Sequence, residues 1–235
     1  MNQVISKDGT GIAFDRLGEG PALILVGGAF QHRAIDPRTA QLAALLAQHF
    51  TAFHYDRRGR GDSSDTQPYT VEREVEDLDA LIKEAGGSAF VFGMSSGGVL
   101  ALEAAKRGLA ITKLALYETP FNSGDEHARQ AAENYTRQLT ALLSEGRRGD
   151  AVALAMTTWG APPEAIAGMR QTPIWPLFES VAPTLAYSQR PRKPPSFQVG
   201  DEWAFLIWLG LGMWGYCMLL LLVLYYRHGL STRAT

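Results

Sequence analysis

Residues 93–97 read Gly-Met-Ser-Ser-Gly, a Gly-x-Ser-x-Gly pattern with Ser95 at its centre. The apolar residues before it favour a strand, and the stretch from Val99 to Arg107 favours a helix. A serine on such a sharp strand-to-helix turn has a strained backbone, which exposes its hydroxyl for attack on a carbonyl carbon. Glycine is expected at 93 and 97 because a Cβ there would collide with the neighbouring helix or strand. The pattern predicts nucleophilic catalysis by Ser95.

Attack by a serine also requires hydrogen-bond donors for the negative oxygen of the tetrahedral intermediate. The amide of Ser96 would lie at the N-terminus of the following helix, where the helix dipole strengthens its effect. A second donor is expected from the loop Gly27-Gly28-Ala29-Phe30, which follows the apolar run 22–26. Such a run reads as a buried strand. The amides of Ser96, Ala29 and Gly28 are therefore the predicted oxyanion hole.

A third segment, residues 56–63, reads Asp-Arg-Arg-Gly-Arg-Gly-Asp-Ser and is expected to form a charged turn after a strand. The Gly-Gly loop, this turn and the serine turn follow one another in the order found in α/β-hydrolase-fold serine hydrolases of the small esterase, lactonase and peptidase kind. Residues 1–187 resemble this family. The resemblance implies a mostly parallel sheet with helices on both faces, and a helical cap over the serine at about 119–187. It also implies a small ester, lactone or amide as substrate. Gly27 stands where many members have a histidine.

The spacing of apolar residues predicts the elements that would position these segments, and they indicate an α/β protein. Strands are expected at residues 3–6, 11–16, 22–26, 52–55, before the serine turn from residue 91, and at 111–117. Helices are expected at residues 37–49, 71–85, 125–145 and 150–158, with short helical pieces from 159 to 186.

The sequence departs from this family after residue 187. Residues 188–202 form a basic, proline-rich linker. Residues 203–226 carry no charged side chain and are long enough to cross a hydrocarbon core of about 30 Å. The alternative is a buried core helix, but tryptophans at one end and tyrosines at the other are typical of a membrane span. We therefore expect a truncated α/β-hydrolase fold plus one C-terminal transmembrane helix, with a short tail at 227–235.

The remaining catalytic groups are harder to assign. In a complete hydrolase of this kind an acid and a histidine follow the serine on two further strand and helix pairs, and this sequence lacks both pairs. Glu118, after the strand 111–117, is the candidate acid, with a purely structural carboxylate as the alternative. His32, which follows the Gly-Gly loop, and His127, at the start of the cap, are the candidate bases. The alternative for both is a solvated loop histidine.

Two hypotheses for function follow. The first is a membrane-anchored serine hydrolase that acts on a small ester-like molecule through Ser95. The second is a catalytically inactive hydrolase fold, either a pseudoenzyme or the product of a gene fusion or frameshift, that serves as a membrane-tethered binding module. The change of character near residue 188 favours the second hypothesis. The intact serine turn and Gly-Gly loop favour the first.

Composition limits the classes of partner and cofactor that this protein is expected to bind. A net charge of −2 offers no broad basic face for nucleic acid, and the sequence lacks the spacings typical of metal or nucleotide sites, so no cofactor is expected. The single cysteine allows no intrachain disulfide.

The first residues lack the apolar core of a signal peptide. We expect a tail-anchored, single-pass protein in a lipid bilayer, with its N-terminal domain in the cytoplasm. The strand 111–117 would be an exposed sheet edge that favours self-association.

Overall fold

The computed structural model describes residues 2–120 and 125–188. Nearly all of the predicted linker 188–202, and all of the predicted transmembrane helix 203–226 and tail 227–235, lie outside the described residues. None of the helices in the described part is long and apolar enough to cross a membrane. The expected span is therefore untested by the structure.

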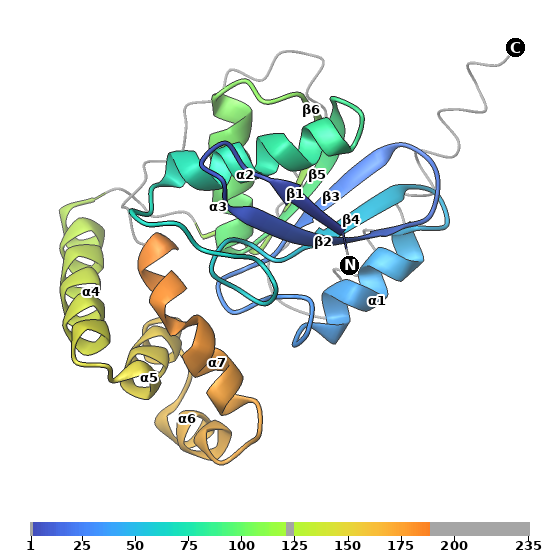
Figure 1. Ribbon diagram of the computed structural model, residues 1–235. Helices are drawn as coiled ribbons and strands as arrows, with labels where there is room; N and C mark the ends of the chain where they lie inside the picture. The colour runs from blue at the N-terminus through green and yellow to red at the C-terminus, as the bar shows by residue number, and fades with distance from the viewer. Residues whose placement is uncertain (1, 121–124, 189–235) are drawn as a thin grey trace, which may run out of the picture.

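A single mixed sheet organises the described chain, with the strand order β1-β2-β4-β3-β5-β6 (Figure 1). The strands are β1 Asn2–Ile5, β2 Gly11–Leu17, β3 Ala22–Val26, β4 Thr51–Tyr55, β5 Ala89–Met94 and β6 Ile111–Tyr117. β1 and β2 pair antiparallel to each other and β2 to β4, whereas β4, β3, β5 and β6 are parallel. Each expected strand is present, and β6 is the outermost strand at its end of the described sheet.

Helices cover both faces of this sheet. On one face α2 Val71–Glu84 and α3 Ser96–Lys106 bury their apolar residues against the strands. On the other face α1 Pro37–Leu46 packs through Ala43 and Leu46. The expected helix 37–49 ends earlier, because residues 48 and 49 bond to carbonyls only three residues back and form a tighter turn. Both faces are thus buried, as a sheet of parallel strands requires.

The last described part of the chain is a separate helical layer, the cap (Figure 1, yellow to orange). It comprises α4 Glu126–Ser144, α5 Arg148–Thr158, α6 Pro163–Arg170, α7 Trp175–Val181 and the 3₁₀ segment Ala182–Ser188. These elements have their own apolar core, which includes Leu139, Val152 and Leu185. The cap is therefore a packed unit rather than a long loop.

The cap meets the sheet layer at the loops that follow β3 and β4. The ring of Phe30, after β3, lies 5.3 Å from that of Trp159 and 4.9 Å from that of Phe178. After β4, Tyr69 stacks on Tyr187 with ring centroids 3.8 Å apart. Because these loops leave the carboxyl ends of parallel strands, the cap sits at the end of the sheet where ligands bind in open α/β folds.

Candidate active site

Ser95 lies at the junction of β5 and α3, with φ +52° and ψ −123°. Its amide donates to the carbonyl of Tyr117 at 2.9 Å, and its carbonyl accepts from the amide of Gly98 at 2.9 Å. A positive φ is uncommon for any residue other than glycine and costs free energy. The backbone at Ser95 is therefore strained and held from both sides, which is the geometry predicted for the serine turn.

The glycines of this turn let three backbone segments approach closely. A Cβ on Gly93 would lie 2.6 Å from Cα of Gly98, and one on Gly97 would collide with the carbonyl oxygens of Val26 and Gly27. The first turn of α3 consequently rests directly on the end of β3 and the loop after it. This contact places the Ser96 amide beside the loop that carries the other predicted oxyanion donors.

The structure departs from the prediction at Gly28. Its amide already donates to Oε1 of Gln31 at 2.5 Å, and Gln31 in turn donates to Oδ2 of Asp36 at 2.5 Å. The amides of Ala29 and Ser96 donate to no group within residues 2–120 and 125–188. The loop lies beside the serine, since a Cβ on Gly28 would be 3.3 Å from the Cβ of Ser95. Of the three predicted donors, Ala29 and Ser96 are therefore the two whose amides are available for an oxyanion.

The predicted acid, Glu118, directly follows β6 and is exposed. It has φ +48°, and Ser95 is the only other non-glycine residue with a positive φ in the described chain. The two strained residues terminate neighbouring parallel strands, which the bond from the Ser95 amide to the Tyr117 carbonyl joins. Glu118 thus lies near the serine turn, although no contact between the two side chains is present.

The two predicted bases differ in environment. His127 is exposed in the first turn of α4. His32 is only 6 % exposed, and neither of its ring nitrogens has a partner within the described residues. Burial lowers the pKa of the His32 imidazole, which favours the neutral, proton-accepting form. No histidine in this part of the chain hydrogen-bonds to Ser95, so the structure does not assemble a complete triad from these residues.

The segment 56–63 is a turn wrapped around a buried carboxylate. Asp56 accepts from the amide of Arg33 at 2.7 Å and from the amide of Asp62 at 2.9 Å. Gly61 has φ +54°, and a Cβ there would collide with the Asp56 carboxylate. This contact requires glycine at position 61 and gives a physical reason for a turn that the sequence predicted only as charged and interrupted by glycines.

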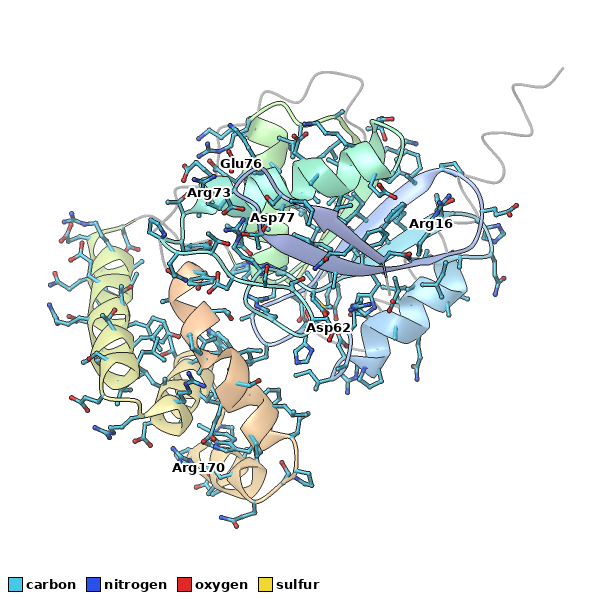
Figure 2. All side chains as sticks on the ribbon, in the orientation of Figure 1. Arg16, Asp62, Arg73, Glu76, Asp77 and Arg170 are labelled. Atoms are coloured by element: carbon cyan, nitrogen blue, oxygen red, sulfur yellow. The ribbon has the colours of Figure 1, made fainter. Side chains whose placement is uncertain are left out.

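Three arginines of this turn are buried, a feature that sequence analysis missed. Arg57 binds Glu74 through two hydrogen bonds of 2.8 and 2.7 Å, and Arg58 binds Asp77 through two of 2.7 and 2.6 Å. Asp77 and its neighbours Arg73 and Glu76 on α2 are labelled in Figure 2. The sequence does contain a signal, since Glu74 and Asp77 fall on the apolar face of the predicted helix 71–85.

The buried arginines also hold the loop after β3. Nη1 of Arg57 donates to the carbonyl of Gly27 at 3.2 Å and to Oγ of Ser96 at 3.1 Å. Nη1 of Arg60 donates to the carbonyl of Gly28 at 2.6 Å. Two successive carbonyls of the loop after β3, those of Gly27 and Gly28, are therefore bound by arginines of the same turn.

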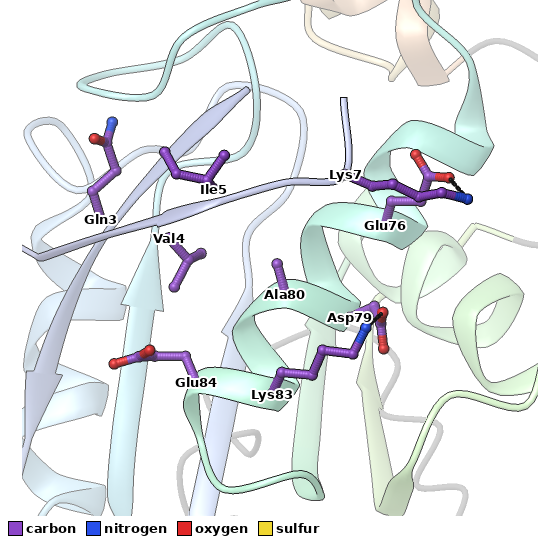
Figure 3. Close-up of a pocket in the computed structure, with 9 residues that line it drawn as sticks. All are labelled: Gln3, Val4, Ile5, Lys7, Glu76, Asp79, Ala80, Lys83 and Glu84. Atoms are coloured by element: carbon purple, nitrogen blue, oxygen red, sulfur yellow. Dashed lines mark hydrogen bonds and ion pairs between the residues drawn. The ribbon is translucent and has the colours of Figure 1, made fainter. Parts of the chain in front are cut away.

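A surface groove of about 690 Å³ lies elsewhere, between β1 and α2 (Figure 3). Its charged residues pair with one another, as in Lys7 with Glu76 at 3.2 Å and Lys83 with Asp79 at 2.6 Å. None of the segments that carry the predicted catalytic groups contributes to it. The groove is distinct from the candidate active site at Ser95.

Comparison with known proteins agrees with the fold described above. A model of the alpha/beta hydrolase family matches residues 23–225, which is most of the sequence. The chain belongs to the alpha/beta hydrolase family. The family match also runs across residues 203–225, where the sequence predicts a membrane span.

Several family members resemble this alpha/beta hydrolase. An alpha/beta hydrolase of known structure from Sphaerobacter thermophilus is 52% identical, with a TM-score of 0.69, over 80% of this chain and 72% of that one. The uncharacterized hydrolase YraK of Bacillus subtilis is 32% identical over 112 residues, which are 43% of this chain. The match spans only 38% of YraK. A thermophilic esterase from Thermogutta terrifontis, 24% identical over 80% of this chain and 70% of its own, shares the fold with a TM-score of 0.58.

Proposed function

We propose that this alpha/beta hydrolase is a serine hydrolase that cleaves a small ester, lactone or amide through Ser95. The observation that carries the proposal is the backbone of Ser95, which is held at φ +52° between β5 and α3. Such strain persists only where the surrounding structure enforces it, and it is characteristic of functional positions. Among the similar proteins, the Thermogutta terrifontis protein is an esterase.

In the proposed reaction, Oγ of Ser95 attacks the carbonyl carbon while a base accepts its proton. The amides of Ser96 and Ala29 donate to the oxyanion of the tetrahedral intermediate. This intermediate collapses to an acyl-serine as the protonated base gives its proton to the leaving alcohol or amine, which for a lactone stays attached to the acyl group. Water then gives a proton to the base and attacks the acyl carbon, and the carboxylic acid leaves as the base returns that proton to Oγ of Ser95. Glu118 is the proposed acid that orients the base. Among the described residues, His32 and His127 are the proposed candidates for the base.

The experiment that tests this proposal is labelling of the purified full-length protein with a fluorophosphonate, which reacts only with activated serines. We expect one labelled peptide, containing Ser95. Ser144→Ala is a suitable control, because Ser144 is exposed at the end of α4. Absence of labelling, in protein shown by circular dichroism to be folded, would instead support the inactive, binding-module hypothesis.

We also propose that residues 203–226 anchor the protein in a membrane, with the preceding domain in the cytoplasm. The support is the uncharged 24-residue stretch with aromatic ends. The full-length protein should fractionate with membranes and resist carbonate extraction, whereas truncation after residue 196 should release it. Recovery of the full-length chain in the soluble fraction would refute the anchor.

A further proposal concerns self-association. A fragment ending at residue 187 leaves β6 as the outer strand of the sheet, and an open edge can pair with another chain. We expect this fragment to self-associate in sedimentation velocity and to unfold at a low temperature. A monodisperse monomer that melts cooperatively above about 60 °C would show that the edge is protected.

A further inference from the structure

Arg60 differs from the other two arginines of its turn because it has no counter-ion within residues 2–120 and 125–188. Its side chain is 1 % exposed, and no carboxylate lies within ion-pair distance among the described residues. Nη2 of Arg60 also lacks a hydrogen-bond partner there. Burial, with a contribution from the nearby Arg57, lowers the pKa of Arg60 to about 9, so it is still charged at neutral pH.

The bonds of Arg60 connect the cap to the oxyanion loop. Nη1 donates to the carbonyl of Gly28 at 2.6 Å, and Nε donates to Oγ1 of Thr184 at 3.1 Å. Thr184 lies in the 3₁₀ segment at the end of the cap, and its own hydroxyl donates to the carbonyl of Val181. The guanidinium is thus fixed in place by the cap and binds the loop beside Ser95.

The carbonyl of Gly28 and the amide of Ala29 are the two ends of one peptide group. In a planar trans peptide the C=O and N–H bonds point in opposite directions, so the orientation of one fixes that of the other. The carbonyl of Gly28 accepts from the Arg60 guanidinium at 2.6 Å and, over a longer 3.3 Å, from the amide of Gln31. The shorter, charged bond therefore helps to set the direction in which the Ala29 N–H points. A charged donor on the carbonyl also polarises the peptide and makes its N–H a stronger donor.

We propose that Arg60 is a positioning residue that orients and polarises the Gly28–Ala29 peptide for the oxyanion. The inference rests on the proposed function, since it assigns the Ala29 amide to the oxyanion hole. It accounts for a buried cation that has no counter-ion among the described residues, an arrangement that lowers stability unless it is compensated. Arg57 makes a similar bond to Gly27, but Glu74 neutralises Arg57 and Gln31 already occupies the amide of the Gly27–Gly28 peptide.

The test compares Arg60→Met, Arg60→Lys and wild type as full-length proteins, measuring kcat and KM on a p-nitrophenyl ester together with the melting temperature. We expect Arg60→Met to lower kcat by about 10- to 100-fold with KM nearly unchanged, because outright loss of an oxyanion donor costs on the order of 10²–10³. Its melting temperature should stay the same or rise. Arg60→Lys should recover part of kcat, since an ammonium can still donate to the Gly28 carbonyl. Arg16→Met, on an exposed position of β2 (Figure 2), is the control.

The amide resonance of Ala29 in a ¹H,¹⁵N spectrum provides a readout that needs no turnover. We expect its proton to shift upfield in Arg60→Met, because the peptide is less polarised. An unchanged resonance, or a kcat within about twofold of wild type, would overturn the role of Arg60 while leaving the serine hydrolase proposal intact. Loss of kcat together with a lower melting temperature and a raised KM would also overturn it, by indicating a structural role. If wild type shows no Ser95-dependent turnover but the resonance moves, the proposed function fails and the orientation of the peptide by Arg60 stands.

Discussion

Replacement of Ser95 by alanine is expected to lower kcat for p-nitrophenyl ester hydrolysis by on the order of 10⁴- to 10⁶-fold, to the level of background. The reason is that the variant removes the atom that forms the acyl intermediate while leaving the oxyanion donors in place. Fluorophosphonate labelling should disappear with it. Alanine at a position with φ +52° remains strained, so the melting temperature should change little.

The histidines provide the accompanying test. If the base lies within the described residues, either His32→Ala or His127→Ala should lower turnover nearly as much as Ser95→Ala, because the members of a triad act as a unit. Equal turnover by wild type and Ser95→Ala, after correction for background, would contradict the enzyme hypothesis. Full activity in both histidine variants would place the base elsewhere in the chain.

Glu74→Ala should destabilise the protein by about 3–5 kcal/mol, because it leaves the guanidinium of Arg57 buried without its counter-ion. Both side chains are 3 % exposed, so solvent cannot replace the lost bonds. Tyr69 would also lose the bond that its hydroxyl makes to Glu74 at 2.8 Å. Urea unfolding followed by circular dichroism gives the free energy of unfolding directly.

A double variant provides the control, since Arg57→Met with Glu74→Leu replaces both charges by apolar side chains. It should recover much of the loss seen in Glu74→Ala. Burial alone would raise the pKa of Glu74, but the charge and hydrogen bonds of Arg57 lower it to about 2. This carboxylate therefore stabilises the fold above its ordinary pKa, and the contribution should disappear as the pH falls towards 2. A double variant as unstable as Glu74→Ala would contradict the ion-pair explanation.

Sequence analysis predicted the parts of the site that depend on local geometry. The strained backbone at Ser95 and the close approach at Gly97 are consequences of a five-residue pattern, and the strand and helix on either side follow from apolar spacing. The occupied amide of Gly28 was not predictable, because it depends on where the side chain of Gln31 points. The buried arginines were missed for a related reason, since Arg57 and Glu74 are 17 residues apart and meet only when the turn packs on α2.

The catalytic base could not be predicted from the sequence for a different reason. A histidine that acts on Ser95 must be brought to it by the tertiary fold, and no spacing along the chain predicts that contact. The structure shows His32 buried and His127 exposed, a difference invisible in the sequence. The predicted span at 203–226 was derived from the length, the apolar composition and the aromatic ends of this stretch, which lies outside the described residues, so membrane fractionation is the measurement that decides it.

The direct contact of Gly97 with the end of β3 has an implication for how this protein can diversify. Because α3 and the loop after β3 touch backbone to backbone there, a change that shifts either segment is expected to shift the amides of Ser96 and Ala29 together. Mutations that alter substrate preference therefore have little freedom in the sheet layer. The cap has its own apolar core, but it meets the loop after β3 through Phe30, which packs on Trp159 and Phe178, and it binds Arg60 through Thr184. Changes in the cap away from these contacts can accumulate without disturbing that loop. If Ser95 is the nucleophile as proposed, we expect substrate preference to change mainly through cap residues that lie away from Phe30 and Thr184.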